Sequence, residues 1–167
     1  MEQYLLGIDI GTSACKIAVF NRKGQVTAAA NGDYQVYYPH PGWAEQNPEE
    51  WWAAVCLAVK EVLSKGSIRP EQIAGVGIDG QSWSAIAVDR AGNVLTNTPI
   101  WMDTRAADIC EELNKKIGAD KIFGLSGNSL QPSYTTAKII WYQRNLPEYP
   151  VNLSAVFHIT QRKYSVV

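Results

Sequence analysis

The sequence predicts an α/β domain with a mixed sheet. Two observations lead to this fold class. Three strand-like segments separated by tight turns fill the first 34 residues, and helix-like and strand-like segments then alternate along the rest of the chain. Consecutive strands joined by tight turns pair antiparallel, whereas strands separated by helices tend to pair parallel. Both kinds of pairing are therefore expected.

The N-terminal region is predicted to form a three-stranded antiparallel meander. Residues 4–10 and 15–20 are apolar strand-like runs, and the Gly-containing segment 11–14 between them predicts a hairpin turn. A second turn is expected at 21–24, where a glycine can adopt a positive φ. The third strand is expected from residue 25 toward residue 34.

A long helix is expected to begin at Asn47 and to end near Gly66. Asn47 can cap the helix, Pro48 suits its first position, and Glu50 stands at capping-box spacing. Apolar residues then recur at helical intervals. Segment 73–79 combines small and β-branched residues and predicts a strand buried on both faces.

The rest of the chain predicts five further elements. They are a hairpin over 85–98, a helix over 103–117, a short helical piece around 121–125, a helix over 133–145 and a strand over 155–160. No low-complexity linker or internal domain boundary is evident. The last residues are apolar, with no polar tail, so we expect a single domain over 1–167 that is cut short and lacks its C-terminal partner domain.

Composition excludes several classes of partner. The 167 residues carry a formal net charge of −1, so no basic excess is present to bind nucleic acid. No apolar run approaches the ~20 residues that cross a bilayer. The start of the chain does not resemble a signal peptide, and we expect a cytoplasmic protein that acts on a small molecule and can form a homodimer.

Cysteine and histidine offer no catalytic pattern. Cys15, Cys56 and Cys110 are far apart in the sequence and stand in apolar stretches, which predicts reduced core residues rather than a metal or disulfide framework. His40 and His158 are isolated, and neither is expected to be catalytic.

The first candidate site is the turn between the first two predicted strands. The backbone N–H groups and hydroxyls of Gly11, Thr12 and Ser13 can converge on an anion such as a phosphate. Lys16 can add a positive charge, and Asp9, at the end of a buried strand, needs a cation, a metal-bound water or N–H donors. A plain hairpin turn with a satisfied Asp9 is the alternative.

Two further segments could bind a sugar or polyol. Gln81, Ser82 and Trp83 follow a strand, where open α/β sheets place ligands, and they combine hydrogen-bonding groups with a flat apolar ring. An ordinary loop is the alternative. The second segment holds Trp101, Asp103 and Arg105, which are also candidate sugar-binding residues. Asp103 and Arg105 could bracket a sugar hydroxyl, or Asp103 could simply cap the following helix.

Together these segments resemble the FGGY carbohydrate kinase family, with xylulokinases as the nearest branch. The resemblance lies in five collinear stretches: 7–13 with Lys16, 41–52, Ile78-Asp79-Gly80-Gln81, Pro99-Ile100-Trp101-Met102-Asp103-Thr104-Arg105, and Gly127-Asn128 through Pro132 to Lys138 and Trp141.

The resemblance implies an RNase H-like domain of the actin-like ATPase fold and an ATP-dependent sugar kinase. It assigns the ATP phosphates to Asp9, Thr12, Ser13 and Lys16, with Mg²⁺ held by Asp9 through water. It points to Gln81, Ser82 and Trp83 for a ketose such as D-xylulose. Residues 82–84 are Ser-Trp-Ser, which departs from the xylulokinase pattern, so another sugar or polyol is an alternative.

The resemblance also implies what the chain lacks. Nothing in residues 1–167 matches the segment with the family's catalytic base Asp or its second domain, so the chain alone is expected to be inactive. A non-catalytic sugar-binding or assembly module is the alternative from another class. A further alternative is another actin-fold phosphotransferase, such as an acetate-type kinase or a hexokinase-like protein.

Overall fold

The computed structural model describes residues 2–146 and 155–157. These residues group into two compact units, and each is described by itself. Unit 1 comprises residues 2–35 and 48–81, and unit 2 comprises residues 36–47, 82–146 and 155–157.

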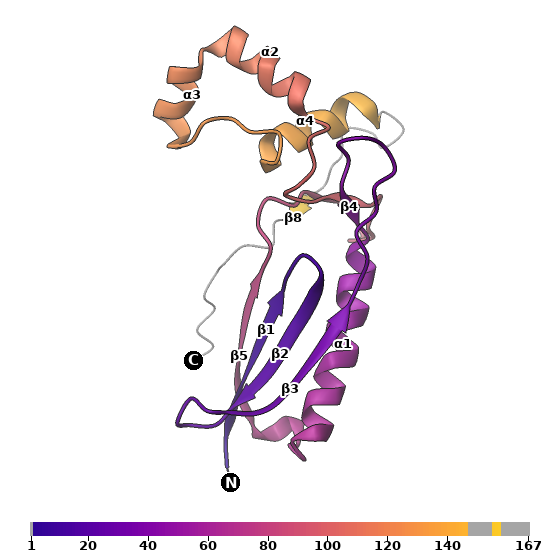
Figure 1. The fold of residues 1–167 in the computed structure, drawn as a ribbon, viewed down its shortest axis with the longest axis vertical. Coiled ribbons are helices and arrows are strands. Elements are labelled where there is room, and N and C mark those ends of the chain that lie inside the picture. The colour runs from indigo at the N-terminus through magenta and orange to yellow at the C-terminus, as the bar shows by residue number, and fades with distance from the viewer. Residues whose placement is uncertain (1, 147–154, 158–167) are drawn as a thin grey trace. The chain divides into compact units, whose positions relative to one another are not determined.

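Unit 1 is built on a four-stranded mixed sheet (Figure 1). Its strands are β1 (Tyr4–Ile10), β2 (Ala14–Phe20), β3 (Val26–Asp33) and β5 (Ile73–Gly80), in the order β3-β2-β1-β5. β2 is antiparallel to both β1 and β3, whereas β5 is parallel to β1. The predicted meander and the predicted mixed sheet are both confirmed.

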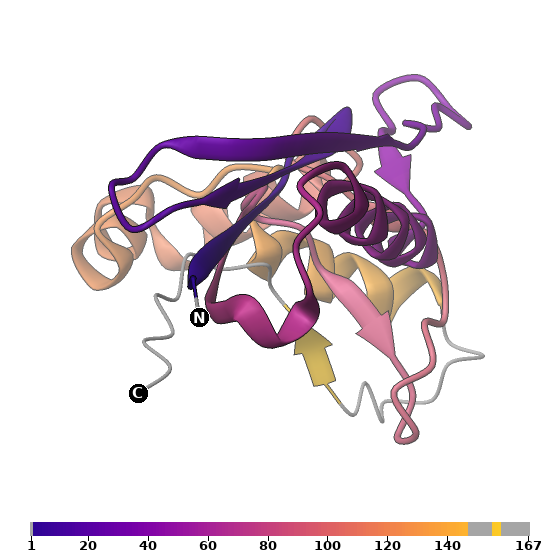
Figure 2. The same ribbon diagram turned by 90° about the horizontal axis from the view of Figure 1, so that it is seen from below.

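One helix covers a face of this sheet. Helix α1 (Pro48–Lys65) starts and stops where the sequence predicts, and the short 3₁₀ helix η1 (Pro70–Gln72) leads from it toward β5. Trp51, Ala58 and Val62 on α1 are buried, as are Ile17 and Val19 on β2. Figure 2 shows α1 running along the sheet. This apolar layer is the core of unit 1.

Strand β5 differs from its prediction. Val76 is 40% exposed and Ile78 is 55% exposed, so the expectation of burial on both faces is wrong for the described residues. The physical reason is its position. Within the described sheet β5 is an edge strand that pairs with β1, while α1 packs mainly over β2 and β3.

Unit 2 combines short strand pairs with three helices. β4 (Glu45–Gln46) pairs antiparallel with β7 (Thr98–Pro99), and β6 (Ile86–Val88) pairs antiparallel with β8 (Ala155–Phe157). The helices are α2 (Ala107–Ile117), α3 (Ala119–Ser126) and α4 (Thr135–Asn145). Buried Ile109 and Cys110 on α2 and Ala137 on α4 belong to one apolar cluster.

The predicted hairpin over 85–98 forms only in part. Its turn is present, because Asp89 N–H donates to the Asn93 carbonyl at 3.0 Å. Val88 and Val94 form a single bridge, and β6 then makes its ladder with β8 instead. The helical predictions around 121–125 and over 133–145 are confirmed.

The predictions for the C-terminal strand and for the cysteines are confirmed in part. The strand predicted over 155–160 is confirmed for residues 155–157, whereas residues 158–160, His158 and the apolar end of the chain lie outside the described residues. All three cysteines are free thiols, with Cys15 and Cys110 buried.

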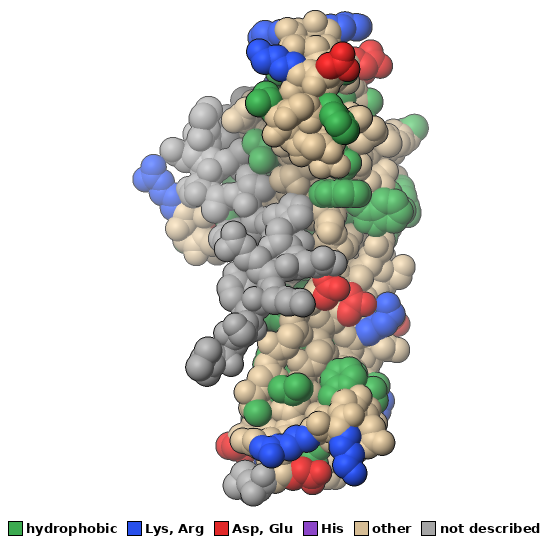
Figure 3. Space-filling view, turned by 90° about the vertical axis from the view of Figure 1, so that its left-hand side faces the viewer, with side chains coloured by type: hydrophobic (Ala, Val, Ile, Leu, Met, Phe, Trp, Pro, Cys, Tyr) green, Lys and Arg blue, Asp and Glu red, His purple; other side chains and the backbone are tan. Residues whose placement is uncertain are grey.

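Surface charge is mixed on the face seen in Figure 3, where basic and acidic side chains occur in small groups. Among the described residues, no helix is long and apolar enough to cross a membrane.

Candidate functional site

The first candidate site lies at the β1–β2 hairpin of unit 1. Asp9 and Lys16 stand opposite each other in the antiparallel register, and Lys16 Nζ is 3.6 Å from Asp9 Oδ2. The Asp9 side chain is 49% exposed, so it is less buried than the sequence predicted. It has a cation beside it and remains accessible to solvent.

The hairpin turn is tight because of its glycine. Gly11 N–H donates to the Ala14 carbonyl at 3.1 Å, and a Cβ at Gly11 would lie 3.1 Å from that same oxygen. The Tyr34 hydroxyl donates to the Gly11 carbonyl, and burial raises the pKa of Tyr34, so this donor stays protonated. Thr12 is half-buried and Ser13 is exposed, which places the turn at the surface of unit 1.

A pocket of about 700 Å³ adjoins this pair on the sheet of unit 1. Small residues contribute to its lining: Gly7, Ala18, Ala29 and Gly77. Polar residues also line it: Asp9, Lys16, Asn31 and Asp79. Two carboxylates would repel a bare phosphate, but a phosphate that carries a divalent cation suits this mixture of charges.

The predicted sugar loop begins beside the hairpin. Gln81 N–H donates to the Ile10 carbonyl at 2.9 Å, which continues the parallel pairing of β1 and β5 by one step. Gln81 is 8% exposed. Within unit 1, the backbone of Gln81 therefore lies next to the start of the 11–14 turn.

Trp83 has an unusual backbone conformation in unit 2. Its φ is +65°, a left-handed value that costs a non-glycine residue roughly 1–3 kcal/mol. Its ring is 42% exposed and lies against the ring of Tyr134, with centroids 4.8 Å apart. The exposed Trp83, backed by the half-buried Tyr134, can contact the C–H faces of a sugar. Tyr134 was not singled out in the sequence, although it falls within the fifth matching stretch.

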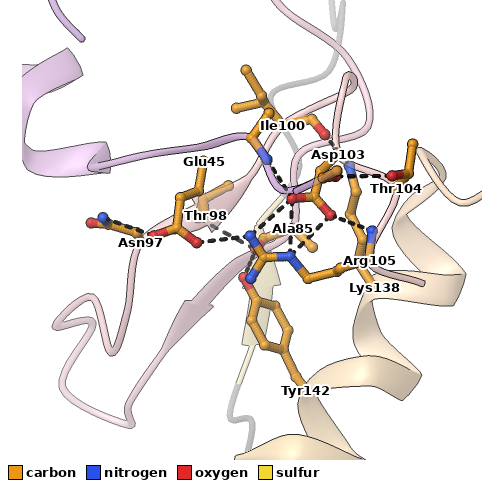
Figure 4. A network of polar contacts seen from close by, with 12 residues as sticks. Glu45, Ala85, Asn97, Thr98, Ile100, Asp103, Thr104, Arg105, Lys138 and Tyr142 are labelled. Atoms are coloured by element: carbon orange, nitrogen blue, oxygen red, sulfur yellow. Dashed lines mark hydrogen bonds and ion pairs between the residues drawn. The ribbon is translucent and has the colours of Figure 1, made fainter. Parts of the chain in front are cut away.

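Asp103 and Arg105 belong to a buried ionic network (Figure 4). Asp103 accepts hydrogen bonds from Arg105 Nε at 2.9 Å and Nη2 at 2.8 Å, and from Ala44 N–H at 2.7 Å. Arg105 Nη2 also donates to Glu45 at 2.7 Å. The Asp103 side chain is 0% exposed and that of Arg105 is 3% exposed.

This burial argues against direct sugar contact by Asp103 and Arg105. Their polar atoms satisfy one another, so we assign them a structural role instead of the predicted one. Helix α2 begins at Ala107, later than predicted, and its N-cap is Ala106 rather than Asp103, whose carboxylate accepts from the Arg105 guanidinium.

Two tryptophans complete the packing around Arg105. The guanidinium carbon lies 3.7 Å from the ring centroid of Trp43 and 5.0 Å from that of Trp141. Such cation–π contacts stabilise a desolvated arginine. Trp43 and Trp141 therefore have a structural role in packing around Arg105.

Lys138 lies in the same network, and the sequence alone gave it no role in the site. It is fully buried on α4, and its Nζ donates to the Trp83 carbonyl at 2.9 Å and to the Ile100 carbonyl at 2.7 Å. Burial lowers the pKa of Lys138 to about 8, with Asp103 raising it and Arg105 lowering it further. A lysine inside an otherwise apolar stretch of the predicted helix was the available signal.

Nearly the whole chain matches one known protein family. The sequence model of the N-terminal domain of the FGGY family of carbohydrate kinases matches residues 4–162. The chain belongs to this family. The predicted resemblance and the RNase H-like, actin-like ATPase fold are therefore confirmed.

Individual FGGY relatives carry different names. The glycerol kinase of Bacillus cytotoxicus is 33% identical over 147 residues, which are 87% of this chain and 30% of that protein. A xylulose kinase structure from Brucella ovis is 30% identical with a TM-score of 0.85, covering 93% of this chain and 32% of that one. The Plasmodium falciparum glycerol kinase solved with ADP is 24% identical with a TM-score of 0.81, covering 90% and 30%, and shows the fold alone.

The chain therefore spans about a third of the length of the FGGY kinases that it matches. The names divide between a polyol and a ketose, so the xylulokinase branch is not decided by the comparisons. Among the described residues, no three His, Cys, Asp or Glu side chains gather as metal ligands.

Proposed function

We propose that the protein carrying this chain is an ATP-dependent kinase that phosphorylates a terminal hydroxyl of a small ketose or polyol. The observation that carries this proposal is the family match over residues 4–162. The hairpin with Asp9 and Lys16, and the exposed Trp83 with its ring against Tyr134, supply the matching chemistry.

The β1–β2 hairpin is the proposed phosphate site. Lys16 would neutralise phosphate charge, while the N–H groups and hydroxyls of Gly11, Thr12 and Ser13 would hold phosphate oxygens. Asp9 would hold Mg²⁺ through water, and the ion would neutralise charge on the phosphates. The exposed carboxylate with a neighbouring ammonium fits this arrangement, and membership of a kinase family favours a nucleotide as the second substrate.

The sugar is assigned to Gln81, Ser82, Trp83 and Trp101. The amide and hydroxyl can exchange hydrogen bonds with sugar hydroxyls, and the Trp83 and Trp101 rings, 42% and 44% exposed, can lie against C–H groups. D-Xylulose is the predicted substrate and glycerol is the principal alternative. The paired rings of Trp83 and Tyr134 offer more apolar surface than a three-carbon chain can cover, which favours the ketose.

No general base is assigned to this chain. Phosphoryl transfer depends on positioning and on charge stabilisation from both sides of the reacting phosphate. The base Asp and the second domain are proposed to lie outside residues 1–167. A protein consisting of these residues alone is expected to show no sugar-dependent release of ADP.

The test begins with the protein in its natural form. Its intact mass is measured, and ADP release is then followed with MgATP and a panel that includes D-xylulose, glycerol and other ketoses and polyols. Preference for D-xylulose supports the full proposal, and preference for glycerol corrects the substrate. No release of ADP with any member of the panel refutes the kinase.

A pair of lysine variants tests the phosphate site. Lys16→Ala is expected to raise the KM for MgATP about tenfold or more, because it removes a charge-assisted contact. Lys23→Ala changes an exposed lysine in the next turn and should leave that KM unchanged. Equal behaviour of the two variants would show that Lys16 does not contact the nucleotide.

A further inference from the structure

The ammonium of Lys138 joins two separate loops of unit 2. One of its carbonyl acceptors belongs to Trp83, in the loop after β5, and the other belongs to Ile100, in the loop after β7. A lysine ammonium has three donors and no acceptor, so it can bind both carbonyls at once. Figure 4 shows Lys138 reaching from α4 into the ionic network.

Each of these two carbonyls belongs to a peptide group of an exposed tryptophan. The first carbonyl is that of Trp83 itself. The second belongs to Ile100, and it lies in the same rigid peptide plane as the nitrogen of Trp101. The Ile100 carbonyl also accepts the Asp103 N–H at 3.0 Å, within its own loop, so the bond from Lys138 is the one that links this loop to the Trp83 loop.

Trp83 needs such a constraint. Its left-handed φ is unfavourable for a bulky residue and persists only where surrounding contacts hold it. The hydrogen bond from Lys138 to the Trp83 carbonyl and the contact between the Trp83 and Tyr134 rings both help to hold it. Loss of the hydrogen bond would weaken the constraint on this backbone conformation.

We propose that Lys138 is a positioning residue for substrate binding, which holds the Trp83 and Trp101 rings in place through the two backbone carbonyls. This inference rests on the proposed function, because it assumes that the two rings contact the sugar. Lys138 itself does not touch the substrate. It acts on affinity by preventing the two loops from moving independently.

The charges around Lys138 make the constraint sensitive to pH. Asp103 and Arg105 face it from the loop before α2, Glu45 on β4 pairs with Arg105, and Tyr142 lies on α4 itself. The pKa of Lys138 is about 8. A neutral amine is a weaker donor than an ammonium, so the hold on both carbonyls should loosen above that pH.

The experiment uses the full-length protein labelled with 5-fluorotryptophan. Resonances are assigned by substituting single tryptophans with Phe, and the variants compared are Lys138→Met and the exposed-lysine control Lys121→Met. Lys138→Met should shift or broaden the resonances of Trp83 and Trp101 and leave that of Trp52 unchanged. Lys121→Met should move none of them.

Kinetics provide the second readout. Lys138→Met should raise the KM for the sugar about tenfold or more, while the KM for MgATP stays the same. Unchanged resonances of Trp83 and Trp101 would overturn the inference, as would an unchanged sugar KM. If the resonances move but no sugar is phosphorylated by the unsubstituted protein, the kinase proposal fails while the positioning of the loops stands.

A titration of the unsubstituted protein covers the case in which Lys138→Met does not fold. The Trp83 and Trp101 resonances should then shift with a midpoint near pH 8, and the Trp52 resonance should not. Resonances of Trp83 and Trp101 that stay flat while Lys138, followed through its own labelled side chain, loses its proton would overturn the inference.

Discussion

Replacing Arg105 with Met should destabilise unit 2 far more than an equivalent change at the surface. The Arg105 side chain is 3% exposed, and it donates to two carboxylates, those of Asp103 and Glu45. After the substitution, the fully buried Asp103 carboxylate would lose the guanidinium and keep the backbone donors of Ala44 and of residue 105 itself. Removing one partner of a buried ion pair leaves an uncompensated charge and costs about 3–5 kcal/mol.

The chain supplies a matched control in Arg144. Its guanidinium also forms two hydrogen bonds with one carboxylate, at 2.7 Å and 3.0 Å to Glu112. The two side chains are 46% and 49% exposed, so water competes for the same groups. Arg144→Met should therefore change the free energy of unfolding little.

The assay is urea unfolding followed by tryptophan fluorescence, because Trp43 and Trp141 lie against the Arg105 guanidinium. The free energy of unfolding of Arg105→Met should fall below that of Arg144→Met by about 2 kcal/mol or more. A difference smaller than about 1 kcal/mol would refute the argument from burial.

A combined variant separates lost charge from lost packing. Arg105→Met together with Asp103→Asn and Glu45→Gln removes both carboxylates that Arg105 neutralises. If the cost of Arg105→Met comes from unpaired buried charge, the triple variant should recover part of the lost stability. No recovery would assign the cost to the aromatic stacking and the shape of the guanidinium instead.

Three further predictions concern other parts of the chain. Gly32→Ala should destabilise the protein by about 1–3 kcal/mol in urea unfolding, because its Cβ would lie 2.8 Å from a carbonyl of α1, whereas Gly77→Ala meets nothing within 4 Å and should change little. The folded-state pKa of Lys138, about 8, lies below its usual 10.5, so between these pH values the unfolded chain binds more protons than the folded one. The free energy of unfolding should therefore rise from pH 7 to pH 9.5, by about 2 kcal/mol more in the unsubstituted protein than in Lys138→Met. Tyr34→Phe removes the hydroxyl that donates to the Gly11 carbonyl, so the KM for MgATP should rise a few-fold with little loss of stability.

The fold could be predicted from the sequence where caps, turns and apolar periodicity agree with the packing. Helix α1 is an example, because Pro48, its apolar period and Gly66 all give the same boundaries. Strand β5 shows the limit of such reasoning. Its composition is typical of a buried strand, but burial depends on what packs over it, and α1 lies mainly over β2 and β3.

The candidate site was less accessible than the fold. The sequence singles out the Asp9–Lys16 hairpin, which the strand register brings together across two adjacent strands. It cannot distinguish Asp103, a fully buried carboxylate, from one that contacts a ligand, because its donor Ala44 is 59 residues away and Glu45, the second partner of Arg105, is 60 residues from that arginine. Lys138 was missed for the same reason, since its acceptors are 55 and 38 residues away.

Charge balance explains why Lys138 matters to this network. Two buried cations, Arg105 and Lys138, accompany two carboxylates, Asp103 and Glu45. Arginine remains charged at any pH that a protein tolerates, whereas burial brings the pKa of Lys138 close to neutrality. Near pH 8, Lys138 is therefore the member of this group whose charge is most easily lost. Because its donors hold the carbonyls of Trp83 and Ile100, the same proton that balances the network also sets the strength of the hold on both loops.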